Sequence, residues 1–417
     1  MENILLVNPI NLKKEIWKWE MKVLILNKWL IVGGVEKVLI NYLDILKDKE
    51  DVKTDLFILF NTDDSVFSKD IPDGVNTKYA FDKEYFLISS RMKRNKKSNI
   101  LNRIKEKIFR IREKIIIKRK LKDYILTGNY DLIIGFSEQF DQYLSFNKIS
   151  IPTMRWVHSS INLNKFSSRR KNLLKKYDKI ITITDEMEQQ LLSLEIESNK
   201  ITTLYNPIDF NNIRTKSEYD SDIKITSKSY LVQVARLDSL KRHSDLIDIF
   251  AKLVEKGIQE DLYIIGKGDE YVQLKTKISQ LNLENRCFLL GEVENPYPYM
   301  KNARLFLHTS EKEGLPTVLL ESMALGVPVV AMDCPTGPKD ILGANSEYGK
   351  LIPMHNKEMF IDAVLELLNN DELRQYYSRQ SLIRVQDFSS EKISQQIDSL
   401  FKQVILEHHK KNELPKP

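Results

Sequence analysis

The feature that most constrains the fold of this chain is an alternation of short β-rich runs and longer stretches with helical periodicity. Each apolar run is followed by a polar or glycine-containing turn, and then by apolar residues recurring every three or four positions. The alternation forms two series, separated by a polar interval around residues 215–228. The expected strands of the first series are Val23–Leu26, Leu56–Phe60, Leu132–Phe136, Thr153–Val157 and Ile180–Thr184, and those of the second are Tyr230–Val234, Leu262–Gly266, Cys287–Leu290, Leu305–His308 and Val327–Met332.

Strands that alternate with helices and are apolar on both faces are typical of parallel sheets covered by helices on both sides. The 417 residues provide enough chain for two or three such domains. The sequence therefore predicts an α/β fold with two doubly wound domains, joined near Asn206-Pro207, where proline favours extended backbone. The predicted divisions are an N-terminal extension of unknown role (1–20), an N-terminal domain (21–205), a C-terminal domain (206–385) and a C-terminal helix (386–417) that is expected to cross back to the N-terminal domain.

The composition and the length of the apolar runs indicate the class of protein and its compartment. Apolar residues make up 42% of the chain and charged residues 29%, which is typical of a globular protein and not of a disordered one. No apolar run approaches the roughly 18 residues that a membrane-spanning helix needs. The apolar patch Ile4–Val7 is too short for a secretory signal. We therefore expect a cytoplasmic protein.

One segment carries the positive charge of the chain. Between Arg91 and Lys122 there are 15 Lys or Arg residues against two Glu, a local charge of +13 in a chain whose net charge is +6. Apolar residues spaced 3, 4, 3, 4 predict a stripe on one face of a helix here, formed by Leu101, Ile104, Ile108, Ile111 and Ile115. Such a basic amphipathic helix suits peripheral contact with an anionic membrane. A helix packed on its own domain remains an alternative, whereas nucleic acid is disfavoured because Phe109 is the only aromatic residue in the segment.

The stretch from residue 310 to residue 326 combines features of a ligand site. It lies between two expected buried strands and should be a loop followed by a helix, so the amides of Thr317 and Val318 would be free to bind phosphate at a positive helix end. Glu313 and Glu321 flank this point, where their carboxylates could accept hydrogen bonds from sugar and ribose hydroxyls. Alternatively, Glu313 only complements the helix dipole and Glu321 lies on a solvated face.

Other candidate residues follow expected strands. Arg236 and Lys241 come after Tyr230–Val234, at the carboxyl edge where open α/β sheets bind ligands, and two cations there could neutralise a diphosphate. Ordinary surface basicity is the alternative. The pair Gly33-Gly34 follows the first strand and would let a ligand approach the backbone. His158 ends Thr153–Val157, although a structural histidine is the usual case.

The sequence gives no reason to expect a metal ion or another cofactor. The only Asp-x-Asp sequence, Asp220-Ser221-Asp222, lies in a polar interval without a preceding buried strand. No His/Cys cluster has the spacing of a zinc site. We therefore expect cations and a helix end to bind the phosphate charge.

Five motifs in order resemble the retaining glycosyltransferases of family 4, which have the GT-B fold. They are VARLDSLKRHSDL, YIIGKGDE, NPYPYMKNARLF, SEKEGLPTVLLESMALG and CPTGPKDIL. The resemblance extends from about Met21 to Phe388 and includes the family's pair of glutamates separated by seven residues, here Glu313 and Glu321. It implies two Rossmann-like domains facing each other across a cleft.

The resemblance also implies roles for single residues. It places His158 and Glu313 beside the donor sugar as catalytic residues, and it assigns the ribose hydroxyls to Glu321. The donor-binding residues implied are Gly33, Gly34, Arg236, Lys241, Gly266, Val293, Gly314, Leu315, Pro316, Thr317, Val318 and Glu321.

The expected function is transfer of a sugar, with retention of configuration, from a nucleoside diphosphate sugar to a glycan or lipid-linked glycan in surface polysaccharide assembly. A UDP-sugar is the favoured donor. Two alternatives stay open at this point. A GT-B epimerase would convert the nucleotide sugar without an acceptor, and a non-catalytic module that binds anionic surfaces would leave Glu313, Glu321, Arg236 and Lys241 without a task.

Overall fold

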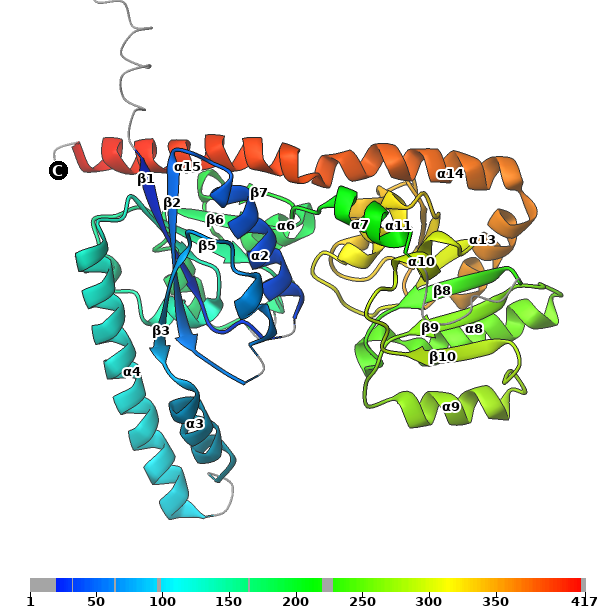
Figure 1. The fold of residues 1–417 in the computed structure, drawn as a ribbon, viewed down its shortest axis with the longest axis horizontal. Coiled ribbons are helices and arrows are strands. Elements are labelled where there is room, and N and C mark those ends of the chain that lie inside the picture. The colour runs from blue at the N-terminus through cyan, green and yellow to red at the C-terminus, as the bar shows by residue number, and fades with distance from the viewer. Residues whose placement is uncertain are drawn as a thin grey trace, which may run out of the picture.

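Two parallel β-sheets, each covered by helices, make up the computed structural model (Figure 1). The structure describes residues 20–413 except 32, 64, 96–98, 164–165 and 220–227. Most of the predicted N-terminal extension and the Asp220-Ser221-Asp222 sequence therefore lie outside the described residues.

In the described part of the chain, the first sheet has seven strands in the order β3-β2-β1-β4-β5-β6-β7. They are β1 (Met21–Asn27), β2 (Val52–Phe60), β3 (Asn76–Phe81), β4 (Leu132–Gly135), β5 (Thr153–Val157), β6 (Lys179–Thr182) and β7 (Ile201–Thr203). All neighbouring strands pair in parallel. The central strands are buried on both faces, which explains their continuous apolar runs.

The second sheet, counted over the same described ranges, has six parallel strands in the order β10-β9-β8-β11-β12-β13. They are β8 (Tyr230–Val234), β9 (Asp261–Ile265), β10 (Cys287–Gly291), β11 (Leu305–His308), β12 (Val329–Met332) and β13 (Lys350–Ile352). The predicted α/β class with two doubly wound sheets is confirmed. The prediction missed β3, β7 and β13.

Helices connect successive strands, and several begin at a side chain that accepts a hydrogen bond from a free backbone amide. Examples are Thr184, which accepts from the Met187 amide at 3.1 Å, and Asn370, which accepts from the Leu373 amide at 2.9 Å. The helices are α2 (Gly34–Lys47), α3 (Lys83–Asn95), α4 (Ile100–Gly128), α5 (Ser168–Leu174), α6 (Asp185–Ser193), α7 (Phe210–Ser217), α8 (His243–Glu255), α9 (Tyr271–Gln280), α10 (Tyr297–Lys301), α11 (Thr317–Ala324), α12 (Pro338–Leu342), α13 (Lys357–Asn369), α14 (Asp371–Arg384) and α15 (Ser390–Glu413).

The basic segment differs from the prediction of one helix near 91–122. It is divided between the end of α3 and most of α4, which together form a hairpin. Asn99 explains where α4 starts, because its side chain accepts a hydrogen bond from the Asn102 amide at 2.8 Å. The helix α4 then continues beyond the basic segment to Gly128.

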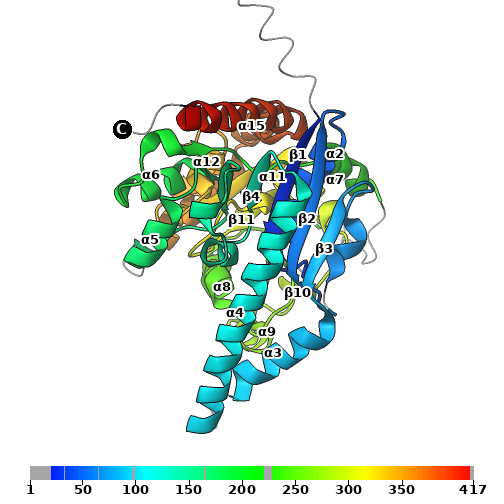
Figure 2. The same cartoon turned by 90° about the vertical axis from the view of Figure 1, so that its left-hand side faces the viewer.

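The helices α14 and α15 run along one side of both domains (Figures 1 and 2). The apolar face of α15 is buried through Ile393, Ile397 and Phe401. Lys49, just after α2, binds the carboxylate of Asp398 at 2.9 Å and the Ser394 hydroxyl at 2.8 Å. The C-terminal helix is therefore attached to the first domain.

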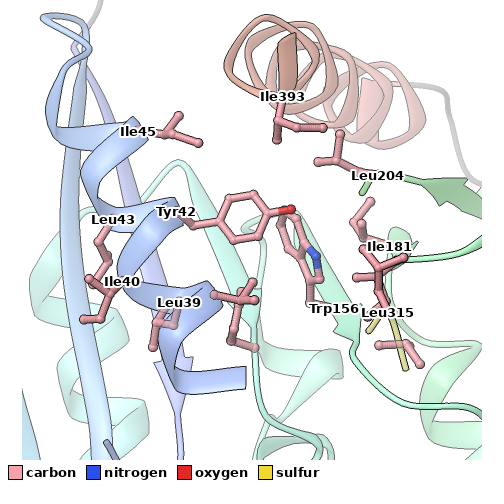
Figure 3. Close-up of a cluster of buried hydrophobic side chains, with 14 of the residues drawn as sticks. Leu39, Ile40, Tyr42, Leu43, Ile45, Trp156, Ile181, Leu204, Leu315 and Ile393 are labelled. Carbon is pink, nitrogen blue, oxygen red and sulfur yellow. The ribbon is translucent and has the colours of Figure 1, made fainter. Parts of the chain in front are cut away.

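A loop of the second domain enters the core of the first. Leu315 belongs to the same buried cluster as Tyr42, Trp156 and Ile181 (Figure 3). The rings of Tyr42 and Trp156 lie 4.8 Å apart, and the Tyr42 hydroxyl donates to the Tyr205 carbonyl at 3.1 Å. This apolar contact positions the segment that carries Glu313 against the first domain.

Candidate active site

A cavity of about 1000 Å³ lies at the carboxyl ends of the first sheet's strands. Its walls include residues that directly follow β1, β4 and β5, and β1 and β4 are neighbours in the sheet although not in sequence. Ligands of open α/β sheets bind where strand order reverses in this way. Four predicted residues meet here, namely Gly33, Gly34 and His158 from the first domain and Arg236 from the second.

Glu313 of the predicted site forms an ion pair with a lysine and a close contact with a histidine. Its Oε1 lies 2.6 Å from Lys241 Nζ and 3.3 Å from Nε2 of the fully buried His308. Burial alone would raise the pKa of Glu313, but His308 and Lys241 outweigh it and lower the pKa to about 2. Glu313 is therefore an ionised carboxylate, paired with a predicted phosphate-binding cation.

Local backbone structure fixes both partners. Lys241 ends a short 3-10 helix, Ser239–Lys241, whose first turn is capped by Asp238. The Thr309 hydroxyl donates to the Lys241 carbonyl at 3.0 Å. On the other side, the Glu313 amide donates to the Pro335 carbonyl at 2.9 Å. The pair is thus held between the loops that follow β8, β11 and β12.

The helix α11 begins at Thr317, with Pro316 as its N-cap, as the sequence predicted. Its first amides, including those of Thr317 and Val318, have no carbonyl partner within the helix. Glu321 is nearly buried on this helix and lies 3.3 Å from the Thr317 hydroxyl. Its other partner is Lys37 of α2, whose Nζ lies 3.5 Å from Glu321 Oε1.

His158 and Gly314 bring the two domains into backbone contact. A Cβ atom on Gly314 would lie 2.7 Å from the His158 carbonyl oxygen, so only glycine allows this approach. The His158 ring lies 4.2 Å from that of Phe136, and neither of its nitrogens has a hydrogen-bond partner of good geometry among the described residues. Burial and the charge of Arg155 lower its pKa to about 3. His158 therefore faces the cavity as a neutral imidazole.

The remaining predicted residues are spread around this centre. Arg236 is largely exposed and pairs with Asp238 at 3.2 Å. Gly266 has a φ of +146°, and a Cβ there would lie 1.9 Å from the Ala235 carbonyl oxygen, so it shapes the loop after β9. Val293 packs partly buried against the core and does not line the cavity. The assigned roles of these residues remain predictions.

Sequence reasoning missed three residues of the site. Lys37 contacts Glu321, His308 contacts Glu313, and Lys312 lines the cavity. His308 ends β11 as His158 follows β5, so the same strand-end signal could have identified it. Nothing in the sequence pairs Lys37 with Glu321, because they lie in different domains.

The carboxylates of the cavity are already engaged. Asp141 accepts a hydrogen bond from Arg155 Nε at 2.8 Å, and Glu138 pairs with Arg170. Glu36 folds back so closely that a Cβ on Gly33 would lie 2.3 Å from its Oε2, and burial raises its pKa. None of these three is placed as a free nucleophile.

The described residues offer neither a metal-binding cluster nor a membrane-spanning helix. No group of three or more His, Cys, Asp or Glu there is arranged to hold a metal ion. In the same part of the chain, no helix has both the length and the apolar content to cross a membrane.

Two family models match the chain, one in each domain. The model described as Glycosyltransferase Family 4 matches residues 82–212, and the one described as Glycosyl transferases group 1 matches residues 215–382. The boundary between the two matches lies within α7.

Individual proteins are similar over most of the length. A relative from Campylobacter jejuni, N-acetylgalactosamine-N,N'-diacetylbacillosaminyl-diphospho-undecaprenol 4-alpha-N-acetylgalactosaminyltransferase, is 31% identical over 254 residues, covering 60% of this chain and 67% of the relative. The crystal structure of Anabaena HepE in complex with UDP is 19% identical, with a TM-score of 0.72, covering 92% of this chain and 100% of that one. A glycosyltransferase from Rickettsia africae is 14% identical, with the same TM-score, covering 93% and 99%.

The solved structures share the two-domain fold, and the motif residues Glu313 and Glu321 lie where the two domains meet. Sequence, fold and family models agree with the resemblance found in the motifs. The chain belongs to the family 4 glycosyltransferases and has the GT-B fold.

Proposed function

We propose that this glycosyltransferase moves a sugar from a nucleoside diphosphate sugar, with UDP as the favoured nucleotide, to a hydroxyl of a glycan or lipid-linked glycan, with retention of configuration. The observation that carries the proposal is the Lys241–Glu313 pair, 2.6 Å apart, beside the start of α11. Gly314, directly after Glu313, touches His158 of the first domain. The complex of Anabaena HepE with UDP supports the choice of nucleotide.

The diphosphate would bind to Lys241, Arg236 and the first amides of α11. These groups stabilise a charge that grows as the diphosphate leaves. Because Lys241 would then be shared with phosphate, Glu313 could accept hydrogen bonds from the sugar hydroxyls. Two cations and a helix end can balance this charge, so we propose transfer without a metal ion or another cofactor.

Retention is proposed to follow a front-face course. The bond from the anomeric carbon to the phosphate oxygen breaks, the acceptor oxygen bonds to that carbon on the same face, and the acceptor proton passes to the leaving phosphate. This course needs no protein nucleophile. The engagement of Glu138 by Arg170 and of Asp141 by Arg155 supports it.

The acceptor is proposed to enter the 1000 Å³ cavity of the first domain, where Trp29 and Phe166 provide apolar surface and Lys28 and Lys312 provide charge. The name of the Campylobacter relative describes a diphospho-undecaprenol acceptor, which supports a lipid-linked glycan in surface polysaccharide assembly. We therefore also propose peripheral contact with an anionic membrane, at the inner face of the cell membrane.

A panel of nucleotides and nucleotide sugars tests this function. One ligand class should raise the melting temperature, and the same nucleotide sugar should release nucleotide when an acceptor is added. Formation of an epimer without an acceptor would favour the epimerase. Failure of every nucleotide to stabilise the protein would contradict the proposal.

A further inference from the structure

The hairpin of α3 and α4 carries an apolar surface that the protein itself leaves uncovered. We call it the hairpin face, and it consists of Leu101, Ile104, Ile108, Ile111 and Ile115 of α4. These side chains are between 48% and 69% exposed. Figures 1 and 2 show the hairpin projecting beyond the first sheet, so no other described element covers this end. An exposed apolar stripe of this kind marks an interaction site.

Polar contacts, and not the hairpin face, hold the two helices together. Arg110 of α4 donates to the Ser89 hydroxyl at 2.7 Å, to the Ser89 carbonyl at 2.9 Å and to Glu113 at 2.8 Å. The buried Ser89 hydroxyl also donates to Glu113 at 3.0 Å. The rings of Tyr85 and Phe109 stack at 5.6 Å. The two helices therefore pack together without the isoleucines of the stripe.

The helical periodicity separates these two faces of α4. At about 100° per residue, the centre of the isoleucine stripe lies roughly 170° around the helix from Glu106, Arg110 and Glu113. The stripe therefore points away from α3, whereas the side of α4 that carries Arg110 and Glu113 faces α3. An exposed apolar stripe opposite the packed side is the arrangement of a helix that lies on a surface.

Positive charge borders the stripe on both sides. At the same angle per residue, Lys105 and Arg112 flank one edge, and Lys107 and Lys118 flank the other. Of the 15 basic residues from Arg91 to Lys122, all but Lys96 and Lys97 lie in the described residues. Long basic side chains beside an apolar stripe can reach lipid phosphates while the stripe enters the acyl boundary.

The hairpin also adjoins the cavity. Phe86, next to Leu87 in α3, packs against the cavity residue Trp29 with ring centroids 6.4 Å apart. On α4, Lys114 lies close enough to Arg169 for the two charges to interact, and the neighbouring Arg170 lines the cavity. A surface bound to the hairpin is therefore close to the cavity.

We propose that the hairpin face is the membrane-docking surface of the enzyme, that its partner is an anionic lipid bilayer, and that docking there holds the cavity beside the lipid surface. The docking itself follows from the described hairpin, whereas delivery of a lipid-linked acceptor to the cavity rests on the proposed function. The occupant is a bilayer because the apolar stripe is bordered by cations on both sides, which complements an anionic headgroup layer above acyl chains.

The test uses the full chain and sedimentation with vesicles of phosphatidylcholine containing 30% phosphatidylglycerol, a probe composition chosen at about one anionic lipid in three. The variant Ile104→Ser/Ile108→Ser/Ile111→Ser should bind these vesicles at least about tenfold more weakly than wild type. The matched control replaces three exposed apolar residues of the second domain, Val272→Ser/Met359→Ser/Ile383→Ser, and should bind like wild type. The melting temperature of the isoleucine variant without lipid should match that of wild type.

A second variant separates charge from apolar contact. The variant Lys105→Gln/Arg112→Gln/Lys118→Gln should bind more weakly, and its residual binding should depend less on salt. Equal vesicle binding by wild type and either hairpin variant would overturn the proposal. So would a large drop in melting temperature of the isoleucine variant, since it would place the stripe in the core. A lipid-free dimer that this variant abolishes would overturn it in favour of a second copy.

Nucleotide binding without vesicles distinguishes this proposal from the proposed function. The isoleucine variant should bind nucleotide as wild type does, because the hairpin face contains no predicted donor residue. Vesicle binding without nucleotide binding would contradict the proposed function alone, and nucleotide binding without vesicle binding would contradict the docking proposal alone.

Discussion

Lys37 of the first domain lies 3.5 Å from Glu321 of the second, so an ion pair crosses the cleft at the residue predicted to hold the donor ribose. The charge of Glu321 is the main cause that raises the pKa of Lys37. A nucleotide that uses Glu321 must share that carboxylate with Lys37 or displace the lysine. The proposed function would therefore link domain contact and donor binding through one side chain.

The variant Glu321→Ala should lower nucleotide affinity by about tenfold or more in calorimetry. Loss of hydrogen bonds to a bound ligand costs roughly 1 to 3 kcal/mol. Lys37→Met is the matched control, because it removes the same ion pair and leaves the carboxylate. A half-exposed pair contributes about 0 to 1 kcal/mol, so this variant should change affinity by less than about fivefold. Equal losses in both variants would show that Glu321 serves only the ion pair.

The contribution of Glu313 to the free energy of unfolding should depend on pH. Its pKa of about 2 lies below the ordinary 4.5, so the unfolded chain binds the proton more tightly. The stabilisation is fully present above pH 4.5 and is lost as pH falls from 4.5 toward 2. The difference in unfolding free energy between wild type and Glu313→Gln should therefore shrink by about 1.4 kcal/mol per pH unit in that window.

Urea unfolding at several pH values between 6 and 3.5 measures this difference. The variant Lys241→Met provides a second comparison. Removing the nearer cation should raise the pKa of Glu313 in the folded protein, so the pH range over which the unfolding free energy changes should become narrower. A constant difference between wild type and Glu313→Gln across these pH values would mean that the carboxylate is not held as described.

Gly314→Ala should impair turnover more than folding. The added Cβ would lie 2.7 Å from the backbone oxygen of His158, which cannot rotate away, so the loop must move. Small displacements of catalytic groups cost about tenfold to a hundredfold in rate. We expect such a loss in kcat, with a melting temperature close to that of wild type. Wild-type kcat in this variant would show that the contact between the two loops is not needed for catalysis.

Transfer should not depend on a divalent metal ion. The rate with excess chelator should equal the untreated rate, and Asp222→Asn should transfer at the wild-type rate. This expectation rests on Arg236, Lys241 and the start of α11 as the groups that balance the diphosphate charge. A rate that falls with chelator and returns with magnesium or manganese would instead favour a metal-bound diphosphate.

The central strands of both sheets could be predicted from sequence, because burial on both faces requires continuous apolar runs. The runs predicted at Thr153–Val157, Tyr230–Val234 and Leu305–His308 match β5, β8 and β11 to the residue. The three missed strands, β3, β7 and β13, all lie at sheet edges. The strand β3 has one paired side and carries polar residues, and β7 and β13 are only three residues long, so none of the three forms such a run.

The sequence predicted several residues of the candidate site but not the partners that they contact. Motif position and the family resemblance gave Glu313, Lys241 and Glu321 as candidates, because each lies in a loop after a strand or near the start of a helix. Their cross-chain partners could not be read from spacing, since Lys37 and Glu321 are 284 positions apart in sequence and meet only when the domains pack. The sequence likewise could not show whether the stripe around Ile108 is exposed. The polar contacts of Arg110 show which side of α4 faces inward.

The most direct test of the proposed function is the configuration of the transferred sugar. The enzyme would be incubated with the UDP-sugar that best stabilises it and with a glycan acceptor, and the new linkage would be followed by proton NMR from the first turnovers. The account predicts release of UDP together with a glycoside whose anomeric configuration equals that of the donor. A product of inverted configuration, or an epimerised donor with no new glycoside, would contradict it.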